Sequence, residues 1–304
     1  MSWGIPIWIY LWAAGMAGGA YFASFLVNIF GGWKQRNLFR LAVCIGVPFA
    51  IIGVLLLVID LGTPIWAWHL FVNFIPVAVM SMGTWILFSW IIICFVMMIL
   101  WIVEWDAAKK PDKYSGNMVN IVQNLSKFLG WIGFVLAILL MGYTGVLLAA
   151  STQPIWANTF LLPALFVASA ISTGVALLVL IGFAVNAMTS KISISSKIIE
   201  RLAEADAVVI VIESLVLIGY AVWLGASGNG GSEALSLLIS GDLALLFWIG
   251  FVLLALLLPL ALDLFNWGKR IEQKSVTFAL GLSAISVLVG GFILRALMTI
   301  GGQQ

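Results

Sequence analysis

Eight apolar segments, each long enough to cross a lipid bilayer as a helix, take up most of the sequence. A helix crosses the hydrocarbon layer in about 20 mainly apolar residues. Of the 304 residues, 63% are hydrophobic and 9% are charged, whereas about a quarter are charged in a soluble domain. The sequence therefore predicts an all-α, polytopic membrane protein. The expected spans are residues 6–30, 40–60, 70–103, 127–150, 158–187, 206–226, 242–265 and 276–299.

The whole chain, residues 1–304, is expected to form a single integral membrane domain in contact with the lipid bilayer. The connections between the spans are too short for a second, soluble domain. We expect the eight spans to form two four-helix bundles, residues 1–150 and 151–304.

Lysine and arginine residues lie almost entirely in alternate connections. Loops on the cytoplasmic side of a membrane carry an excess of these residues. The three even-numbered connections have none, so we expect the odd-numbered connections to be cytoplasmic, both termini to face outward, and the protein to lie in the cell membrane. The basic residues of the odd-numbered connections are Lys34, Arg36, Arg40, Lys109, Lys110, Lys113, Lys127, Lys191, Lys197, Arg201, Lys269, Arg270 and Lys274.

Metal-ligating residues are scarce. The chain has one histidine, His69, and two cysteines, Cys44 and Cys94, both within apolar segments. A membrane haem held by two imidazoles needs two histidines, and a cubane iron–sulfur cluster needs about four thiolates. We therefore expect no haem or metal in this chain. A net charge of +2 without a basic stripe also argues against a nucleic-acid partner.

Asp60 and His69 are placed at the outer membrane face by the predicted topology. Asp60 ends the second span and His69 is close to the start of the third, with a proline-containing turn between them. One interpretation is a helix-capping Asp beside a hydrated His. The other is a protonatable pair that serves a bound redox molecule, because the ordinary pKa of histidine, about 6.5, suits proton exchange.

Tyr143 lies inside the fourth span, near its outer end, in the segment Gly142-Tyr-Thr-Gly145. A phenol at this depth is expected to form a hydrogen bond. The flanking glycines leave space beside it that would accommodate a quinone head group. The alternative is a hydrogen bond to a carbonyl of a neighbouring helix.

Small residues recur in the first span. Gly15 and Gly19 are four residues apart, as are Ala14 and Gly18, a spacing typical of closely packed membrane helices. Helix packing is one explanation, and space for a flat ring or its tail is the other. Tyr10 lies about one turn nearer the outside and would face the same space.

Three further charged residues fall inside spans, beyond the first residue of each, where an ionisable group is costly and needs a partner or a function. Glu213 in the sixth span and Asp263 near the inner end of the seventh are candidates for a proton path from the inside. A structural ion pair is the alternative. Arg295 in the eighth span is expected to extend to the interface or to pair with Asp242.

Four motifs together resemble the membrane subunit of the polysulfide reductase family, also called NrfD-like. The resemblance covers essentially the whole chain, and the order and spacing of the motifs carry it. The motifs are Tyr10-Leu-Trp-Ala-Ala-Gly-Met-Ala-Gly-Gly19, Asp60-Leu-Gly-Thr-Pro64, Ser81-Met-Gly-Thr-Trp85 and Gly142-Tyr-Thr-Gly145.

The resemblance implies a haem-free subunit that binds a quinone, menaquinone or ubiquinone, in the first bundle near the outer face. It also implies two partners on that face: an iron–sulfur cluster subunit and a molybdopterin-type catalytic subunit containing molybdenum or tungsten. Tyr143 matches the tyrosine of the family that bonds a quinone carbonyl. Some relatives use a first-span histidine and asparagine for the other carbonyl, whereas this chain has Tyr10 and Ile7 there. Tyr10, Asp60 or His69 would take their place.

Two other functions remain as alternatives. One is a subunit that translocates protons through Glu213 and Asp263, driven by the redox chemistry of a partner. The other is a secondary transporter, since transporters also place polar residues near the midplane of the membrane.

Overall fold

The computed structural model describes residues 4–60, 78–110, 114–150, 153, 155–156, 159–188, 194–267 and 274–303, and in these ranges it contains helices and no strand. Within them, eight helical segments are long and apolar enough to cross a membrane, which confirms the predicted number of spans. The helices are α1 (Ile5–Phe30), α2 (Arg36–Asp60), α4 (Val79–Lys109), α5 (Gly116–Ala149), α6 (Leu161–Met188), α7 (Ser196–Ala226), α8 (Asn229–Ile239), η3 (Leu246–Leu257), α9 (Leu258–Asn266) and α10 (Lys274–Gly301).

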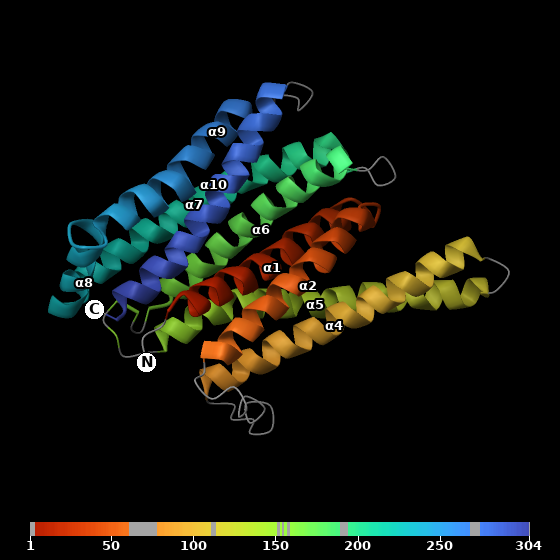
Figure 1. The fold of residues 1–304 in the computed structure, drawn as a ribbon, viewed down its shortest axis with the longest axis horizontal. Helices are drawn as coiled ribbons and strands as arrows, with labels where there is room; N and C mark the ends of the chain where they lie inside the picture. The colour runs from red at the N-terminus through yellow and green to blue at the C-terminus, as the bar shows by residue number, and fades with distance from the viewer. Residues whose placement is uncertain are drawn as a thin grey trace.

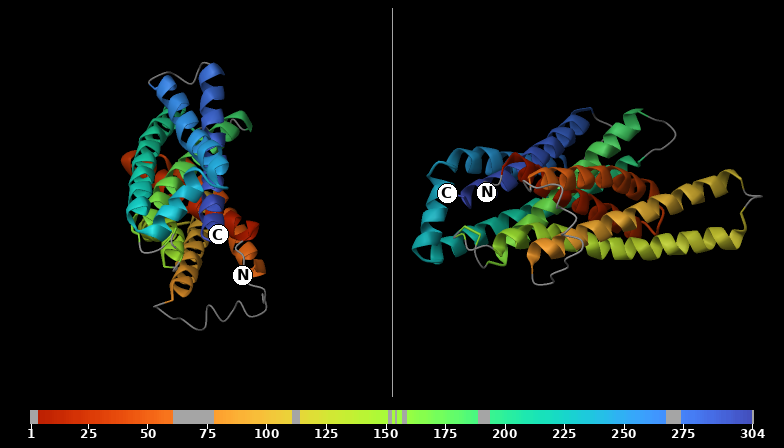
Figure 2. Two further views of the ribbon diagram at one scale, coloured as in Figure 1. Left: turned by 90° about the vertical axis from the view of Figure 1, so that its left-hand side faces the viewer. Right: turned by 60° about the horizontal axis from the view of Figure 1, so that its bottom comes forward.

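The start of α1 and the end of α10 lie at one end of the helices, and the C-terminal ends of α4 and α6 lie at the opposite end (Figures 1 and 2). Following the distribution of basic residues, we refer to the end with the start of α1 as the outer end. Several helices extend further than their apolar segments. In particular, α5 begins at Gly116 and α7 at Ser196, each about ten residues before the expected span, because their polar first turns continue the helix beyond the apolar run.

Helices α1 and α6 form the centre of the molecule, and most of each is buried. Their backbones touch where they cross. A Cβ atom at Gly19 would lie 1.8 Å from the Ala170 carbonyl oxygen, and one at Gly174 would lie 2.2 Å from the Ala20 nitrogen. Small residues permit this close approach of membrane helices, which explains why the first span is rich in glycine.

The other helices pack around this pair. Helix α2 lies against α1, α4 pairs with α5, α7 lies against α6, and α10 packs on η3, α9 and α6 (Figure 1). Helix α5 also contacts both α1 and α6. We retain the division into two four-helix bundles at residue 150 as a proposal, in which α1 and α6 form the seam.

The seventh span begins as a π-helix, η3, and continues as the α-helix α9. Pro259 lies just after the change. It has no N–H to donate to the carbonyl four residues earlier, that of Ala255, and its ring would clash with that carbonyl in an α-helix. Local π geometry relieves such conflicts in membrane helices. Helix α10 approaches the same point, since a Cβ at Gly290 would lie 2.3 Å from the Ala255 Cβ.

Candidate functional site

Tyr10 of α1 and Tyr143 of α5 meet in the outer half of the first four spans. Their hydroxyl groups lie close enough to interact with each other. Both side chains are buried, Tyr10 almost completely. The pair places two phenols, each able to donate and to accept a hydrogen bond, in apolar surroundings.

Two glycines give the tyrosine rings their positions. A Cβ atom at Gly83 of α4 would lie 1.8 Å from Cζ of Tyr143, so the ring occupies the space that any side chain at position 83 would fill. On α2, a Cβ at Gly53 would lie 3.2 Å from Cδ2 of Tyr10. Gly83 belongs to one of the four sequence motifs, but nothing in the sequence pointed to Gly53.

A cavity of about 650 Å³ lies beside Tyr143, between α4, α5, α6 and α7. Apolar side chains line it almost throughout, among them Met82, Val146 and Phe160. Pockets that bind apolar ligands have this character, with a few polar groups that fix the orientation of the ligand. Among the described residues that line this cavity, Tyr143 has the one polar side chain.

Gly15 and Gly18 contact protein atoms. A Cβ at Gly18 would lie 3.0 Å from Cγ of Met141, and one at Gly15 would lie 3.4 Å from Nη2 of Arg295. The space beside both glycines is therefore filled by neighbouring helices, which supports the helix-packing explanation. Their assignment to a ligand stays a prediction.

Asp60 is the last residue of α2 and is half-buried at the outer end. His69 and the proline-containing turn between the two lie outside the described residues. The predicted Asp60–His69 pair therefore stays a prediction.

Glu213 and Asp263 are both buried in the second half of the chain. Glu213 lies about 17 residues into α7, because the helix begins ten residues before the apolar segment. Asp206 of α7, which we did not single out in the sequence, is buried as well, and its hydroxyl partner is Ser172 at 2.8 Å. Asp206 is the first residue of the expected apolar span, and this position was the sequence signal that could have identified it.

The expectation for Arg295 is wrong. Its side chain is fully buried instead of reaching the interface, and it donates hydrogen bonds to the Ser169 hydroxyl and to the carbonyl oxygens of Gly291 and Phe166. Asp242 is exposed at the outer end. Helix α10 tilts across α6 and α1, so Arg295 faces their crossing and not the membrane surface.

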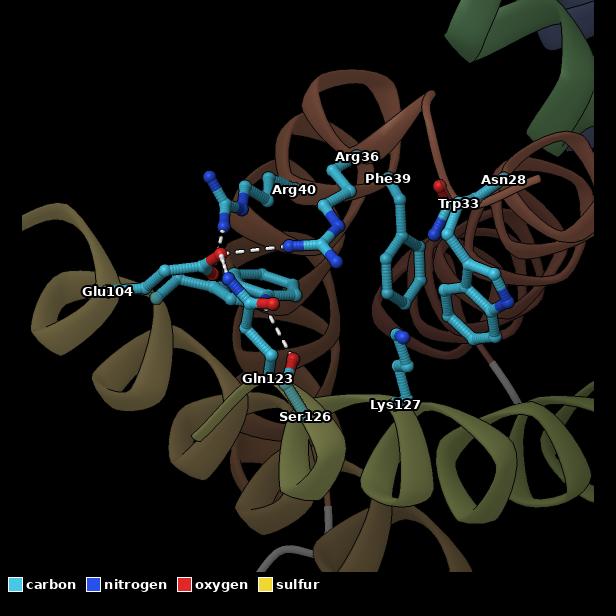
Figure 3. Close-up of a pocket in the computed structure, with 10 residues that line it drawn as sticks. Asn28, Trp33, Arg36, Phe39, Arg40, Glu104, Gln123, Ser126 and Lys127 are labelled. Atoms are coloured by element: carbon cyan, nitrogen blue, oxygen red, sulfur yellow. Dashed lines mark hydrogen bonds and ion pairs between the residues drawn. The ribbon is translucent and has the colours of Figure 1, made fainter. Parts of the chain in front are cut away.

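A second polar group lies at the inner end of α2, α4 and α5 (Figure 3). Glu104 of α4 forms ion pairs with Arg36, at 2.8 Å, and with Arg40, and it accepts a hydrogen bond from Gln123 at 3.0 Å. Lys127 lies over the ring of Trp33. The pocket beside them has a volume of only about 20 Å³. We interpret this group as an ionic connection between helices and not as a binding site.

These features define a class of protein: a multi-pass membrane protein with a buried tyrosine pair beside an apolar cavity. The profile of the family described as "Polysulphide reductase, NrfD" matches residues 1–304, and the chain belongs to that family.

Three relatives are similar over nearly the whole chain. One component of the polysulfide reductase of Wolinella succinogenes is 29% identical, with 99% of this chain and 94% of that protein covered. Protein NrfD of Escherichia coli is 29% identical, with 100% and 95% covered. One component of the selenate reductase of Mesobacillus selenatarsenatis is 24% identical, with 98% and 73% covered.

Proposed function

We propose that the chain is the membrane subunit of a quinone-linked reductase complex and that the Tyr10–Tyr143 pair binds the head group of menaquinone or ubiquinone. The observation that carries this proposal is the pair of buried, interacting tyrosine hydroxyls at the edge of an apolar cavity. Two relatives are named as single components of a polysulfide reductase and of a selenate reductase, which supports membership of a multi-component reductase. Family membership also favours this function over a secondary transporter.

The residues present fit a quinone. The cavity beside Tyr143 is large and apolar enough for the hydrocarbon part of such a molecule. Since a phenol can accept one hydrogen bond and donate another, Tyr143 can bond to Tyr10 and still donate to a carbonyl oxygen of the ligand. Asp60 at the outer end and, as predicted from the sequence, His69 would be protonatable groups near the site.

When bound, a quinone supplies two-electron, two-proton redox chemistry. The chain itself would bind the quinone, orient it and exclude water from the site. The Tyr143 hydroxyl would fix one carbonyl oxygen, and a hydrogen bond from Tyr10 would hold that hydroxyl in place. Gly83 and Gly53 leave the space that the two tyrosine rings occupy, since any larger side chain at position 83 would displace Tyr143.

Electrons would pass between the quinone and a partner. One histidine and two cysteines are too few ligands for a bis-histidine haem or a cubane cluster. We propose that an iron–sulfur subunit docks on the outer face, whose connections lack basic residues, and that it contacts a molybdopterin-type catalytic subunit. The catalytic centre for the terminal substrate would then lie in that subunit and not in this chain.

Tyr143→Phe tests the site, because this change removes only the hydroxyl. A hydrogen bond to an oxygen that gains charge contributes about 1.5–3 kcal/mol, so we expect kcat/KM for quinol to fall by roughly 10- to 100-fold. The measurement is quinol turnover by the complex purified through a tag on this chain, in which iron with molybdenum or tungsten should co-purify.

Tyr21→Phe is the matched control. Tyr21 is another buried tyrosine of α1, and its hydroxyl donates to the Gly130 carbonyl at 3.0 Å, away from the cavity. This variant should keep normal quinol kinetics once it is assembled. Normal kinetics in Tyr143→Phe would show that the quinone binds elsewhere.

A further inference from the structure

Four buried carboxyl or guanidinium side chains lie in the described part of the second half of the chain, and the Tyr10–Tyr143 site uses none of them. Asp206 and Glu213 come from α7, Asp263 from α9 and Arg295 from α10, and each is at most 4% exposed. Charged groups inside a membrane are costly and almost always have a partner or a role in moving ions or protons.

Two serines of α6 connect three of these groups. The Ser172 hydroxyl donates to the Asp206 carboxyl at 2.8 Å. One turn nearer the outer end, the Ser169 hydroxyl accepts a hydrogen bond from Arg295 and lies close to the Glu213 carboxyl. Because α6 and α7 run in opposite directions, the inner serine meets the inner carboxyl and the outer serine meets the outer one.

Asp263 lies closest to the inner end, three residues before the end of α9. Both of its carboxyl oxygens are buried, and neither has a hydrogen-bond partner within the described ranges. It interacts electrostatically with Asp206 and lies beside Ser283. A buried carboxylate without hydrogen-bond partners is costly while it is charged, so this group favours binding a proton.

The number of charges requires protons in this region. Three carboxyl groups and one guanidinium would carry a net charge of −2 if all were ionised, and the region is buried among apolar helices. Such a group can be neutral only if carboxyls hold protons, which makes them exchangeable proton sites.

A bound metal ion explains these buried carboxyls less well than protonation does. Asp206 and Glu213 are seven residues apart on α7, a rise of roughly 10 Å, whereas a cation such as Ca²⁺ needs six to eight oxygens around one point. No three histidine, cysteine or acidic side chains in the described part of the chain are placed to hold a metal ion. The carboxyls follow one another along the membrane normal instead.

Arg295, the outermost of these groups, approaches α1, the helix that carries Tyr10. Nη2 of Arg295 lies 3.4 Å from the position of a Cβ at Gly15 of α1. Gly15 is five residues from Tyr10 along the same helix, a rise of roughly 7–8 Å. Arg295 therefore lies against the helix that carries Tyr10, between one and two turns nearer the inner end.

We propose that these groups transfer protons between the inner side of the membrane and the tyrosine site, and we refer to them as the carboxyl series: Asp263, Asp206, Ser172, Ser169, Glu213 and Arg295. The proposal rests on the proposed function for its proton acceptor. Reduction of one quinone to quinol takes up two electrons from the partner subunit and two protons, which would come from the inner side. In quinol oxidation the same two protons would leave along the series.

Proton uptake by the complex in sealed vesicles tests the proposal, with pH-sensitive dyes on each side and quinone turnover followed at the same time. Glu213→Gln keeps the size of the side chain but removes the proton site. We expect it to lower proton exchange with the inner side at least tenfold while quinone affinity stays unchanged. Asp206→Asn should have the same effect. Glu233→Gln, at an exposed residue of α8, should match the wild type.

The outcomes separate the two proposals. If protons still come from the inner side at the wild-type ratio to electrons in both Glu213→Gln and Asp206→Asn, the carboxyl series is wrong and the quinone site is unaffected. If Tyr143→Phe leaves turnover intact while Glu213→Gln stops proton exchange, the quinone site is wrong, and the carboxyl series transfers protons to an acceptor other than the tyrosine site.

Infrared spectroscopy of the purified full chain gives a second test that needs no turnover. The wild type should show the carbonyl band of a protonated, buried carboxyl at neutral pH, and Glu213→Gln or Asp206→Asn should reduce it. Ser172→Ala removes only the hydroxyl that bonds to Asp206 and should shift this band. It serves as the test variant if the two acid variants assemble poorly. A wild-type chain without the band would overturn the proposal.

Discussion

At the scale of single residues, glycines control where the two tyrosines lie. Tyr143 can meet Tyr10 only because position 83 has no side chain: the ring of Tyr143 fills the space in which a Cβ would stand. Hydropathy does not distinguish this glycine from the others in the apolar segments. Its role depends on an aromatic residue in a different span.

We expect Gly83→Ala to displace the Tyr143 ring, because the new Cβ would lie 1.8–2.4 Å from three ring atoms. Quinol turnover should fall about as far as in Tyr143→Phe, with the complex still assembled. Gly281→Ala, where a Cβ meets nothing within 4 Å, is the control for a glycine-to-alanine change in a helix. Unchanged turnover in Gly83→Ala would mean that the ring position does not matter for binding.

At the scale of elements, the crossing of α1 and α6 determines how the two halves of the chain meet. The contact is between backbones, so it cannot adapt by a change of side-chain rotamer. The serines and Phe166 of α6 that bond to Asp206 and Arg295 lie on the same helix as this crossing. The crossing therefore positions the carboxyl series as well as the core.

Gly19→Ala should destabilise the protein, because the Cβ would lie 1.8 Å from the Ala170 oxygen and 2.6 Å from its carbonyl carbon. Overpacking of this kind typically costs about 1–3 kcal/mol, and more where backbone must move. We expect a lower Tm and a lower folded yield in detergent. Gly219→Ala, whose Cβ would lie 3.9 Å from Leu161, should melt like the wild type; equal melting of Gly19→Ala would contradict the close crossing.

At the scale of the whole molecule, the distribution of lysine and arginine predicts which side each end faces. In a background without Cys44 and Cys94, a cysteine at exposed Ser240 should react with a membrane-impermeant thiol reagent added to intact cells. A cysteine at exposed Lys110 should react only after the cells are opened. The opposite pattern would invert the topology, and with it the side from which the carboxyl series takes protons.

Much of the fold was predictable from the sequence. The number of spans follows from the length of each apolar run, which is a local property. The ends of α5 and α7 were not predictable in this way, because helices continue past the hydrocarbon layer. Tyr143, Glu213 and Asp263 could be selected one at a time, since a polar residue in an apolar segment is visible without any knowledge of its neighbours.

The sequence by itself determined the membrane class, the eight spans and their expected orientation, because apolar length and basic residues act segment by segment. Only the tertiary structure decided which polar groups meet: Tyr10 with Tyr143, Asp206 with Ser172, and Arg295 with Ser169. The physical reason lies in the membrane. Lipid is as apolar as the interior of the protein, so a span has no polar face that marks which side is buried, and close packing through small residues selects the neighbours instead.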